Sequence, residues 1–371
     1  MPNPLSVPSG AHARVCTHAR IPGGIAGGVE RYRRFYRSGR CDLPGLDAAV
    51  AGPTRVDESP SPEGVVRKFT LAVDSAPGDE RTLETESVII PMIGRKGILS
   101  HTLCVSSQVG CAMGCVFCQT GQMGLIRQLS VAEIVRQWWV ARHDLGCNTV
   151  RNVVFMGMGE PMDNLDAVIG AIAILTDHNG PALPMSKITV STVGRLDGIA
   201  LLADQVRKPG WHRLNLAISV NAPNDEVRSR IMPVNRAMPM GRLREALEIW
   251  PIYGAAKLCL EYVLIPGVND REEHARELGD WVLGRDMYAG RPALPGLVNV
   301  IPYNPRDNSP WPAPEEARVN EFLAWLLETG VYAKRRRTKG RDTMAACGQL
   351  GNVGLKKQRS GVGVPSISVR S

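Results

Sequence analysis

The chain has 371 residues, 44% of them hydrophobic, and 44 Lys and Arg against 36 Asp and Glu give it a net charge of +8. This length can bury one large α/β domain with a small appendage. No apolar run reaches the roughly 18 residues of a membrane span, and the N-terminus lacks the apolar core of a secretory signal. Nine irregularly placed cysteines do not resemble a secreted disulfide framework. We therefore expect a cytoplasmic protein, without membrane contact, whose basic charge suits a polyanion such as RNA.

The N-terminal part reads as an extension. Residues 1–64 are rich in Pro and Gly and predict a small helical or partly disordered region, with one clear helix candidate at Glu30–Arg40. Val65–Val73 and Thr85–Ile93 then predict a β-hairpin around a PGDE turn. We assign residues 65–100 to this hairpin or short sheet, which leads into the main domain.

Strands and helices alternate from His101 onwards. The strand candidates are Thr102–Ser106, Asn152–Met156, Lys187–Thr192, Leu214–Asn221, Leu258–Ile265 and Leu297–Tyr303. The helix candidates are a capped helix opened by Ser130 and Glu133, Leu165–Thr176, Arg195–Asp204, Gly241–Ile249, Asp270–Leu283 and Glu315–Thr329. This order predicts an α/β fold, an incomplete (βα)6 barrel over residues 101–350, with chemistry at the carboxyl ends of its strands. Residues 351–371 read as a basic tail.

The segment GCAMGCVFCQ places Cys111, Cys115 and Cys118 in the loop after the first barrel strand. Three thiolates can hold three irons of a [4Fe-4S] cluster and leave the fourth open. An open iron can bind S-adenosylmethionine (SAM) and reduce it to a 5'-deoxyadenosyl radical. The alternative is a zinc knuckle, but a closed zinc site needs four ligands, and His101 and Cys104 lie several residues away.

A basic stretch, AKRRRTKGR, covers Ala333–Arg341, and KKQR follows at Lys356–Arg359. Such a run is often only a solvated face. Beside an active-site loop it is suited to binding the phosphates of a nucleic acid.

Several segments together resemble one family, the RlmN and Cfr radical-SAM adenosine methyltransferases of RNA. They occur in the family's order and read TLCVSSQVGCAMGCVFCQTG, NVVFMGMGEPMDN, ITVSTVG, LAISVNAPNDEVRSRIMPVN, EYVLIPGVND, VIPYNP and TKGRDTMAACGQL. The resemblance covers about Thr85 to Leu350. The residues before about Val65 do not clearly resemble the family's helical N-terminal domain.

The resemblance implies a route through two cysteines. Cys347, in AACGQL, would take a methyl group from one SAM, and the radical from a second SAM would remove hydrogen from that S-methyl group. The methylene radical would then add to adenine. Cys104 would release the methylated base and leave a transient disulfide with Cys347. Glu86 matches the family's proton acceptor; Glu84, two residues away, is the alternative that the match to ESVIIP disfavours.

The resemblance also implies a SAM pocket at the strand ends. Its expected residues are Gly159, Glu160, Ser191, Ser219, Val220, Asn221 and Asn304. Asn221 stands where the family usually has His, and Asn can replace a hydrogen bond of imidazole but not its titration.

The implied function is methylation of a ring carbon of an adenosine in 23S ribosomal RNA or transfer RNA, with C2 favoured and C8 as the alternative. An electron donor such as flavodoxin or ferredoxin would supply the reducing equivalent. Two rivals remain: a radical-SAM enzyme with another substrate, which would need neither Cys104 nor Cys347, and a zinc-stabilised RNA-binding protein without catalysis.

Overall fold

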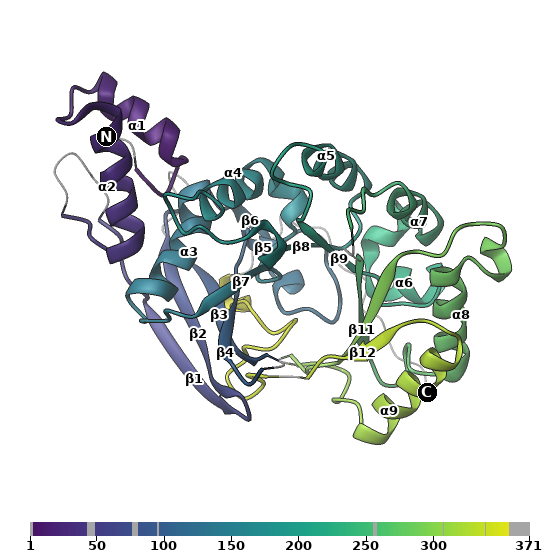
Figure 1. Ribbon diagram of the computed structural model, residues 1–371. Helices are drawn as coiled ribbons and strands as arrows, with labels where there is room; N and C mark the ends of the chain where they lie inside the picture. The colour runs from purple at the N-terminus through teal and green to yellow at the C-terminus, as the bar shows by residue number, and fades with distance from the viewer. Residues whose placement is uncertain are drawn as a thin grey trace.

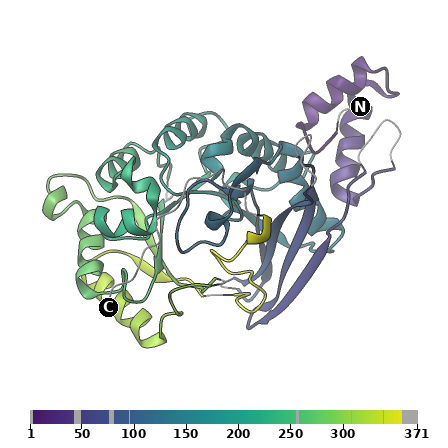
Figure 2. The same ribbon diagram turned by 180° about the vertical axis from the view of Figure 1, so that it is seen from behind.

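A curved ten-stranded sheet forms the centre of the molecule. The computed structural model describes residues 3–42, 49–75, 81–94, 96–254, 258–306, 308–337 and 339–355. Within these residues the strand order is β1-β2-β3-β4-β7-β8-β9-β10-β11-β12. The helices of the main domain lie along the convex side of the sheet (Figures 1 and 2). The C-terminal part of the described chain passes along its concave side.

The first four strands are antiparallel. They are β1 (Arg55–Ser61), β2 (Gly64–Val73), β3 (Leu83–Ile93) and β4 (Leu99–Cys104). The hairpin predicted at 65–93 is therefore present as β2 and β3, and its PGDE turn lies outside the described residues. Because β1 pairs with β2, the sheet begins before the boundary drawn at residue 64. An edge strand tolerates proline, so the sequence DESPS read as a turn although it forms β1.

The remaining strands run parallel to β4. They are β7 (Val150–Phe155), β8 (Ile188–Thr192), β9 (Asn215–Ser219), β10 (Leu258–Leu264), β11 (Gly296–Pro302) and β12 (Ala333–Arg335). All six predicted barrel strands are confirmed, and so is the α/β class with an incomplete barrel. The sheet is mixed and its described ends, β1 and β12, do not pair. Strand β12 was not predicted, because three residues inside an arginine run carry no strand signal.

Seven helices of the described chain follow the cysteine loop. They are α3 (Val131–His143), α4 (Leu165–Leu175), α5 (Leu196–Val206), α6 (Asp225–Ile231), α7 (Met240–Glu248), α8 (Glu272–Leu283) and α9 (Glu316–Glu328). The capping box of α3 is present: the Ser130 N–H donates to Glu133 Oε2 over 2.8 Å, and the Glu133 N–H donates to Ser130 Oγ over 3.3 Å. The prediction omitted α6, whose seven residues are too few for a periodic pattern.

Shorter elements complete the main domain. A two-stranded sheet of β5 (Gln108–Cys111) and β6 (Gly124–Gln128) carries Cys111, the first cysteine of the segment GCAMGCVFCQ. The 3-10 helices are η1 (Thr120–Gln122), η2 (Pro161–Asn164), η3 (Met185–Lys187), η4 (Pro233–Arg236), η5 (Asp286–Tyr288) and η6 (Val353–Leu355). Among the helices of the described chain, none is both long and apolar enough to span a bilayer.

The N-terminal extension forms two helices, α1 (Ser9–His18) and α2 (Gly24–Ser38), beside α3 and α4 (Figure 1). The Phe35 ring stacks on Trp139, with 5.6 Å between ring centroids. The Ser9 N–H donates to Asp177 Oδ2 over 2.6 Å, which fixes the start of α1 on the main domain. Trp138 and Trp139 are buried, and their rings pack against Tyr36 and Phe35 of α2.

Because Phe35 is fully buried against Trp139, we expect Phe35→Ala to destabilise the protein by about 3–5 kcal/mol through the lost burial and the cavity left behind. Ile25→Ala, on the same helix at a side chain 60% exposed, is the matched control and should leave stability within about 0.5 kcal/mol. Chemical denaturation followed by tryptophan fluorescence measures both. Equal stabilities for the two variants would show that α2 does not stabilise the main domain.

Candidate active site

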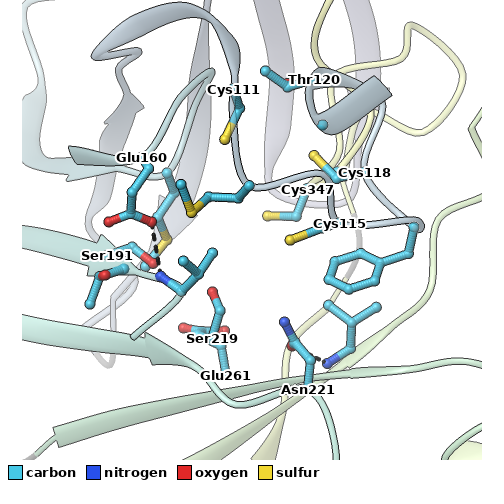
Figure 3. Close-up of a pocket in the computed structure, with 18 of the residues that line it drawn as sticks. Cys111, Cys115, Cys118, Thr120, Glu160, Ser191, Ser219, Asn221, Glu261 and Cys347 are labelled. Carbon is cyan, nitrogen blue, oxygen red and sulfur yellow. Dashed lines mark hydrogen bonds between the residues drawn. The ribbon is translucent and has the colours of Figure 1, made fainter. Parts of the chain in front are cut away.

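Two adjoining cavities lie at the carboxyl ends of the parallel strands. The first, which we call the cysteine cavity, is lined among others by Cys111, Cys115, Cys118, Glu160, Ser191 and Ser219. Figure 3 shows the sulfur atoms of these three cysteines and of Cys347 pointing into one space. Ser191 and Ser219 lie at the ends of β8 and β9, and Glu160 follows β7, as expected for a barrel of this class.

The three predicted ligand cysteines come from one loop. Cys111 ends β5, and Cys118 directly precedes the turn into η1, where its N–H donates to Cys115 O over 3.1 Å. Gly114 has φ +64°, a left-handed conformation that glycine adopts without strain and that turns the chain back between Cys111 and Cys115. Burial raises the pKa of all three thiols. They would therefore ionise only when a cation binds among them.

Glu160 is a buried carboxylate beside the cysteines. Its Oε2 accepts a hydrogen bond from the Val193 N–H over 2.9 Å (Figure 3). Its Oε1 accepts one from the Met162 N–H over 3.1 Å. Burial raises the pKa of Glu160 to about 7. An ammonium group placed in the cavity would favour the ionised form of this carboxyl. Before it, Gly159 has φ +105°, and a Cβ there would lie 2.6 Å from the side chain of Gln108.

Asn221 has a structural reason to be asparagine. Its φ is +56°, a left-handed conformation that Asn tolerates better than most residues. Its Oδ1 accepts a hydrogen bond from the Val263 N–H over 2.9 Å, and the residue lines the cysteine cavity. Val220 is fully buried and is not among the lining residues. Its N–H bonds to Glu261 O and its carbonyl to Arg228, so its backbone supports the turn rather than facing the cavity.

The second cavity, which we call the basic cavity, joins residues far apart in sequence. Cys104 and Cys347 both line it, together with Asn304. Part of the predicted phosphate-binding stretch also lines it, namely Arg335, Arg336, Arg337 and Lys339. Cys347 and Arg336 belong to both cavities, so the nucleophile candidate lies where they meet. Asn304, predicted for the SAM pocket, lies in the basic cavity instead, where its Nδ2 donates to Cys347 O over 3.3 Å.

All nine cysteines are free thiols, so no disulfide joins Cys104 to Cys347 here. Burial raises the pKa of Cys104 to about 12, the nearby Cys347 adds to the rise, and Arg336 opposes it. Cys104 is thus a neutral thiol, which must lose its proton before its sulfur can attack a second sulfur atom.

Glu86 is 7% exposed and lies beside the loop that carries Cys347. Its Oε2 accepts a hydrogen bond from the Gly351 N–H over 3.1 Å, and it is not among the residues that line either cavity. Burial raises the pKa of Glu86, whereas Lys68 lowers it. Glu84, the alternative, is more exposed and accepts a hydrogen bond from Thr54 Oγ1 over 2.7 Å.

Comparison with known proteins decides the family. Residues 105–279 match the model of the Radical SAM superfamily. A probable dual-specificity RNA methyltransferase RlmN 1 from Protochlamydia amoebophila is 43% identical over 278 residues, which are 75% of this chain and 72% of the relative. The chain belongs to the RlmN family of radical SAM methyltransferases.

Other relatives of this RlmN-family protein agree. A dual-specificity RNA methyltransferase RlmN from Phenylobacterium zucineum is 39% identical over 310 residues, covering 81% of this chain and 74% of the relative. The crystal structure of a radical SAM methyltransferase from Sphaerobacter thermophilus superposes with a TM-score of 0.80 at 32% identity, covering 94% of this chain and 99% of that one. The family implies SAM and a [4Fe-4S] cluster as cofactors.

The residues present fit such a cluster. No group of three or more His, Cys, Asp or Glu in the described part of the chain is arranged around a single metal ion. A cluster instead binds each cysteine to a different iron and needs wider spacing. The loop is closely packed around this space: a Cβ on Gly121 would lie 2.9 Å from Cys115 O. Cys111, Cys115 and Cys118 would hold the cluster.

Two residues of the site were missed by sequence reasoning. Glu261 lines the cysteine cavity and is 5% exposed; its Oε1 accepts from the Cys259 thiol at 3.1 Å and its Oε2 from Asn299 Nδ2 at 2.9 Å. A lone carboxylate inside the apolar strand LCLEYVL was the signal available. Arg336, 3.9 Å from Glu261, could not be distinguished from the neighbouring arginines of its run.

The packing of Gly121 predicts that Gly121→Ala displaces the Cys115 backbone and weakens retention of the cluster by about 10-fold. Gly241→Ala is the control, since a Cβ there meets no atom within 4 Å. Iron content and visible absorption of anaerobically purified protein measure the effect. Full iron content in Gly121→Ala would contradict the assigned position of the cluster.

Proposed function

We propose that this protein methylates a ring carbon of an adenosine in RNA, through a methyl group carried on Cys347. The observation that carries the proposal is that Cys104 and Cys347, 243 positions apart in the numbering, line one cavity together with four cationic side chains. A polar methyl transfer needs no such pair of thiols. Cationic side chains at the entrance suit the phosphates that flank a base placed in the cavity.

The residues would divide the work as follows. Cys347, at the meeting point of the two cavities, would accept a methyl group from the cysteine cavity and present it to adenine in the basic cavity. Cys104 would attack the Cys347 sulfur after the base is joined to it, releasing methylated RNA and leaving a transient disulfide between the two. Glu86, next to the loop of Cys347, would accept the proton of the ring carbon.

The cofactors would bind in the cysteine cavity. The cluster and two SAM molecules per turnover supply a methyl group and a 5'-deoxyadenosyl radical when bound. Glu160, a buried carboxylate that lines this cavity, would receive the ammonium of SAM. Ser191, Ser219 and Asn221 line the cavity and would bond its ribose and adenine. A flavodoxin or ferredoxin would supply the electron, and the free thiols suit the reducing cytoplasm.

The proposed RNA is 23S ribosomal RNA, transfer RNA or both, with C2 of adenosine as the position. Incubating the reconstituted enzyme with total RNA from a strain lacking its gene, followed by nucleoside mass spectrometry, tests this. 2-Methyladenosine is expected. 8-Methyladenosine would move the proposal to the alternative position, and the absence of any methylated adenosine would overturn it.

Replacing the methyl carrier should abolish activity. In Cys347→Ala no methylated adenosine forms and no methyl group appears on the protein by intact mass, whereas iron content stays normal because Cys347 is not a proposed cluster ligand. Cys41→Ala, a thiol in the N-terminal extension, is the control and should retain activity. Methylation by Cys347→Ala would rule out this role.

Replacing the resolving cysteine should stop the reaction one stage later. Because Cys104 would cleave the bond between protein and RNA, Cys104→Ala is expected to accumulate a covalent complex that survives a denaturing gel. Nuclease treatment should then leave a modified adenosine on a peptide that contains Cys347. Normal turnover without an adduct would mean that another group releases the product.

A further inference from the structure

Lys68 is a lysine that the proposed mechanism does not use, although it is buried beside the reaction space. Its exposed fraction is 5%, against 7% for Glu86, and its Nζ lies 3.9 Å from Glu86 Oε2. A lysine is almost never buried to this degree without a partner. Among the residues that the structure describes, its second ion pair is with Asp57, 4.0 Å away and one-third exposed.

The register of the sheet explains why this lysine faces the site. Lys68 on β2 pairs with Val88 on β3, and Val88 pairs with Cys104 on β4. Directly paired residues project from the same face of a sheet. Cys104 lines the basic cavity, so Lys68 belongs to the face that turns toward it. Glu86 lies two residues from Val88 and therefore shares that face, diagonal to Lys68.

The charged groups around Glu86 come from three strands. Lys68 of β2 and Arg55 of β1 favour its ionised form, and Glu84 of β3 disfavours it. Arg55 is mostly exposed and pairs with Asp57 at 3.0 Å, so solvent and that carboxylate weaken its influence. From the C-terminal loop, Gly351 contributes an N–H and no charge. Lys68 is thus the buried cation closest to Glu86 among these groups.

We propose that Lys68 is a positioning residue that keeps Glu86 ionised and directed toward the Cys347 loop, so that Glu86 can take the ring proton of the RNA adduct. The inference rests on the proposed function. In the step concerned, the C–H bond of the adenine carbon breaks, its electron pair stays with the ring, and the proton forms an O–H bond on Glu86. A carboxyl group that burial had already protonated could not accept it.

The test compares Lys68→Met, which keeps the length of the side chain and removes its charge, with Lys68→Arg, which keeps the charge. Single-turnover reactions with total RNA from a strain lacking the gene are run between pH 6 and pH 9. Adduct is followed on denaturing gels and methylated adenosine by mass spectrometry. Since release requires ionised Glu86, it rises with pH through the pKa of that carboxyl.

Without the Lys68 charge, only the Gly351 N–H and the exposed Arg55 oppose the effect of burial on Glu86, and its pKa rises further. In Lys68→Met the pH at which release is half-maximal should therefore move upward, and release at the acidic end of the range should slow by about 10-fold for each pH unit of that movement. Methylation of Cys347, seen by intact mass, should be unchanged. Lys68→Arg should keep the parent profile. A Lys68→Met profile identical to that of the parent overturns the inference.

Arg67→Met is the matched control, because Arg67 is adjacent on β2, projects from the opposite face and pairs with Glu58 at 2.8 Å. Glu86→Gln distinguishes a failure of the role of Lys68 from a failure of the proposed function, because this variant should trap the adduct at every pH. If Glu86→Gln traps the adduct while Lys68→Met behaves as the parent, only the role of Lys68 fails. If Glu86→Gln turns over normally, the proton acceptor of the proposed function fails.

A stability cycle tests the pair without turnover. Lys68→Met alone leaves a buried carboxylate without its cation and should lower the unfolding midpoint of the full chain, whereas adding Glu86→Gln should restore most of the loss. If Lys68→Met alone does not fold, a folded double variant supports the inference in the same way. If the double variant is as unstable as Lys68→Met, the two side chains are not coupled and the inference is wrong.

Discussion

The site depends on how the loop around Cys347 is held between the two halves of the sheet. The Gln119 N–H donates to Gly348 O over 2.7 Å, and Gln349 Nε2 donates to Pro305 O over 2.8 Å, which ties the loop to the cysteine segment and to the end of β11. The Gly351 N–H reaches Glu86 on β3. Because these partners belong to three separate parts of the chain, the position of the Cys347 sulfur is fixed only after the whole sheet has formed. Gly348 adopts φ +84°, so the turn beside the sulfur needs glycine.

Charge is distributed to match this arrangement. The cysteine cavity contains two buried carboxylates, Glu160 and Glu261, and three thiols whose pKa values are raised by burial. The lining of the basic cavity includes three arginines and Lys339 against one carboxylate, Glu63, which pairs through Oε2 with Lys339 Nζ at 2.9 Å. Arg336 lies where the cavities meet. The pKa of its guanidinium is raised by Cys347 and, against the effect of burial, by Glu261. One side of the shared sulfur therefore favours cations and the other favours anions, which are the charges of SAM and of RNA.

Periodicity and motif order were enough to predict strands β4 and β7 to β11, most helices and the cysteine loop, because each depends on local sequence. Strand β12 was not predictable, because it forms on the edge of β11 from a sequence that reads as a charge run. Strand β1 was missed for another reason: it pairs with the adjacent β2, but its Pro60 is untypical of a strand interior. The limit met at β12 also applied to the site. Its cysteines carry a recognisable spacing, but the burial of Lys68 and the contact of Arg336 with Glu261 come from register and curvature, which a single sequence does not encode locally.

The mixed character of the sheet has a functional consequence. The parallel strands β7 to β9 place Glu160, Ser191 and Ser219 around the cysteine cavity, as their carboxyl ends would in any incomplete barrel. The antiparallel strands supply the other face: Glu86 comes from β3 and Lys68 from β2. Strand β4 is antiparallel to β3 and parallel to β7, so it belongs to both halves, and Cys104 is its last residue. A parallel barrel alone would keep Cys104, which ends β4, but would lack the buried Glu86 and Lys68. In the proposed mechanism, the added antiparallel strands therefore supply the proton acceptor and the cation beside it.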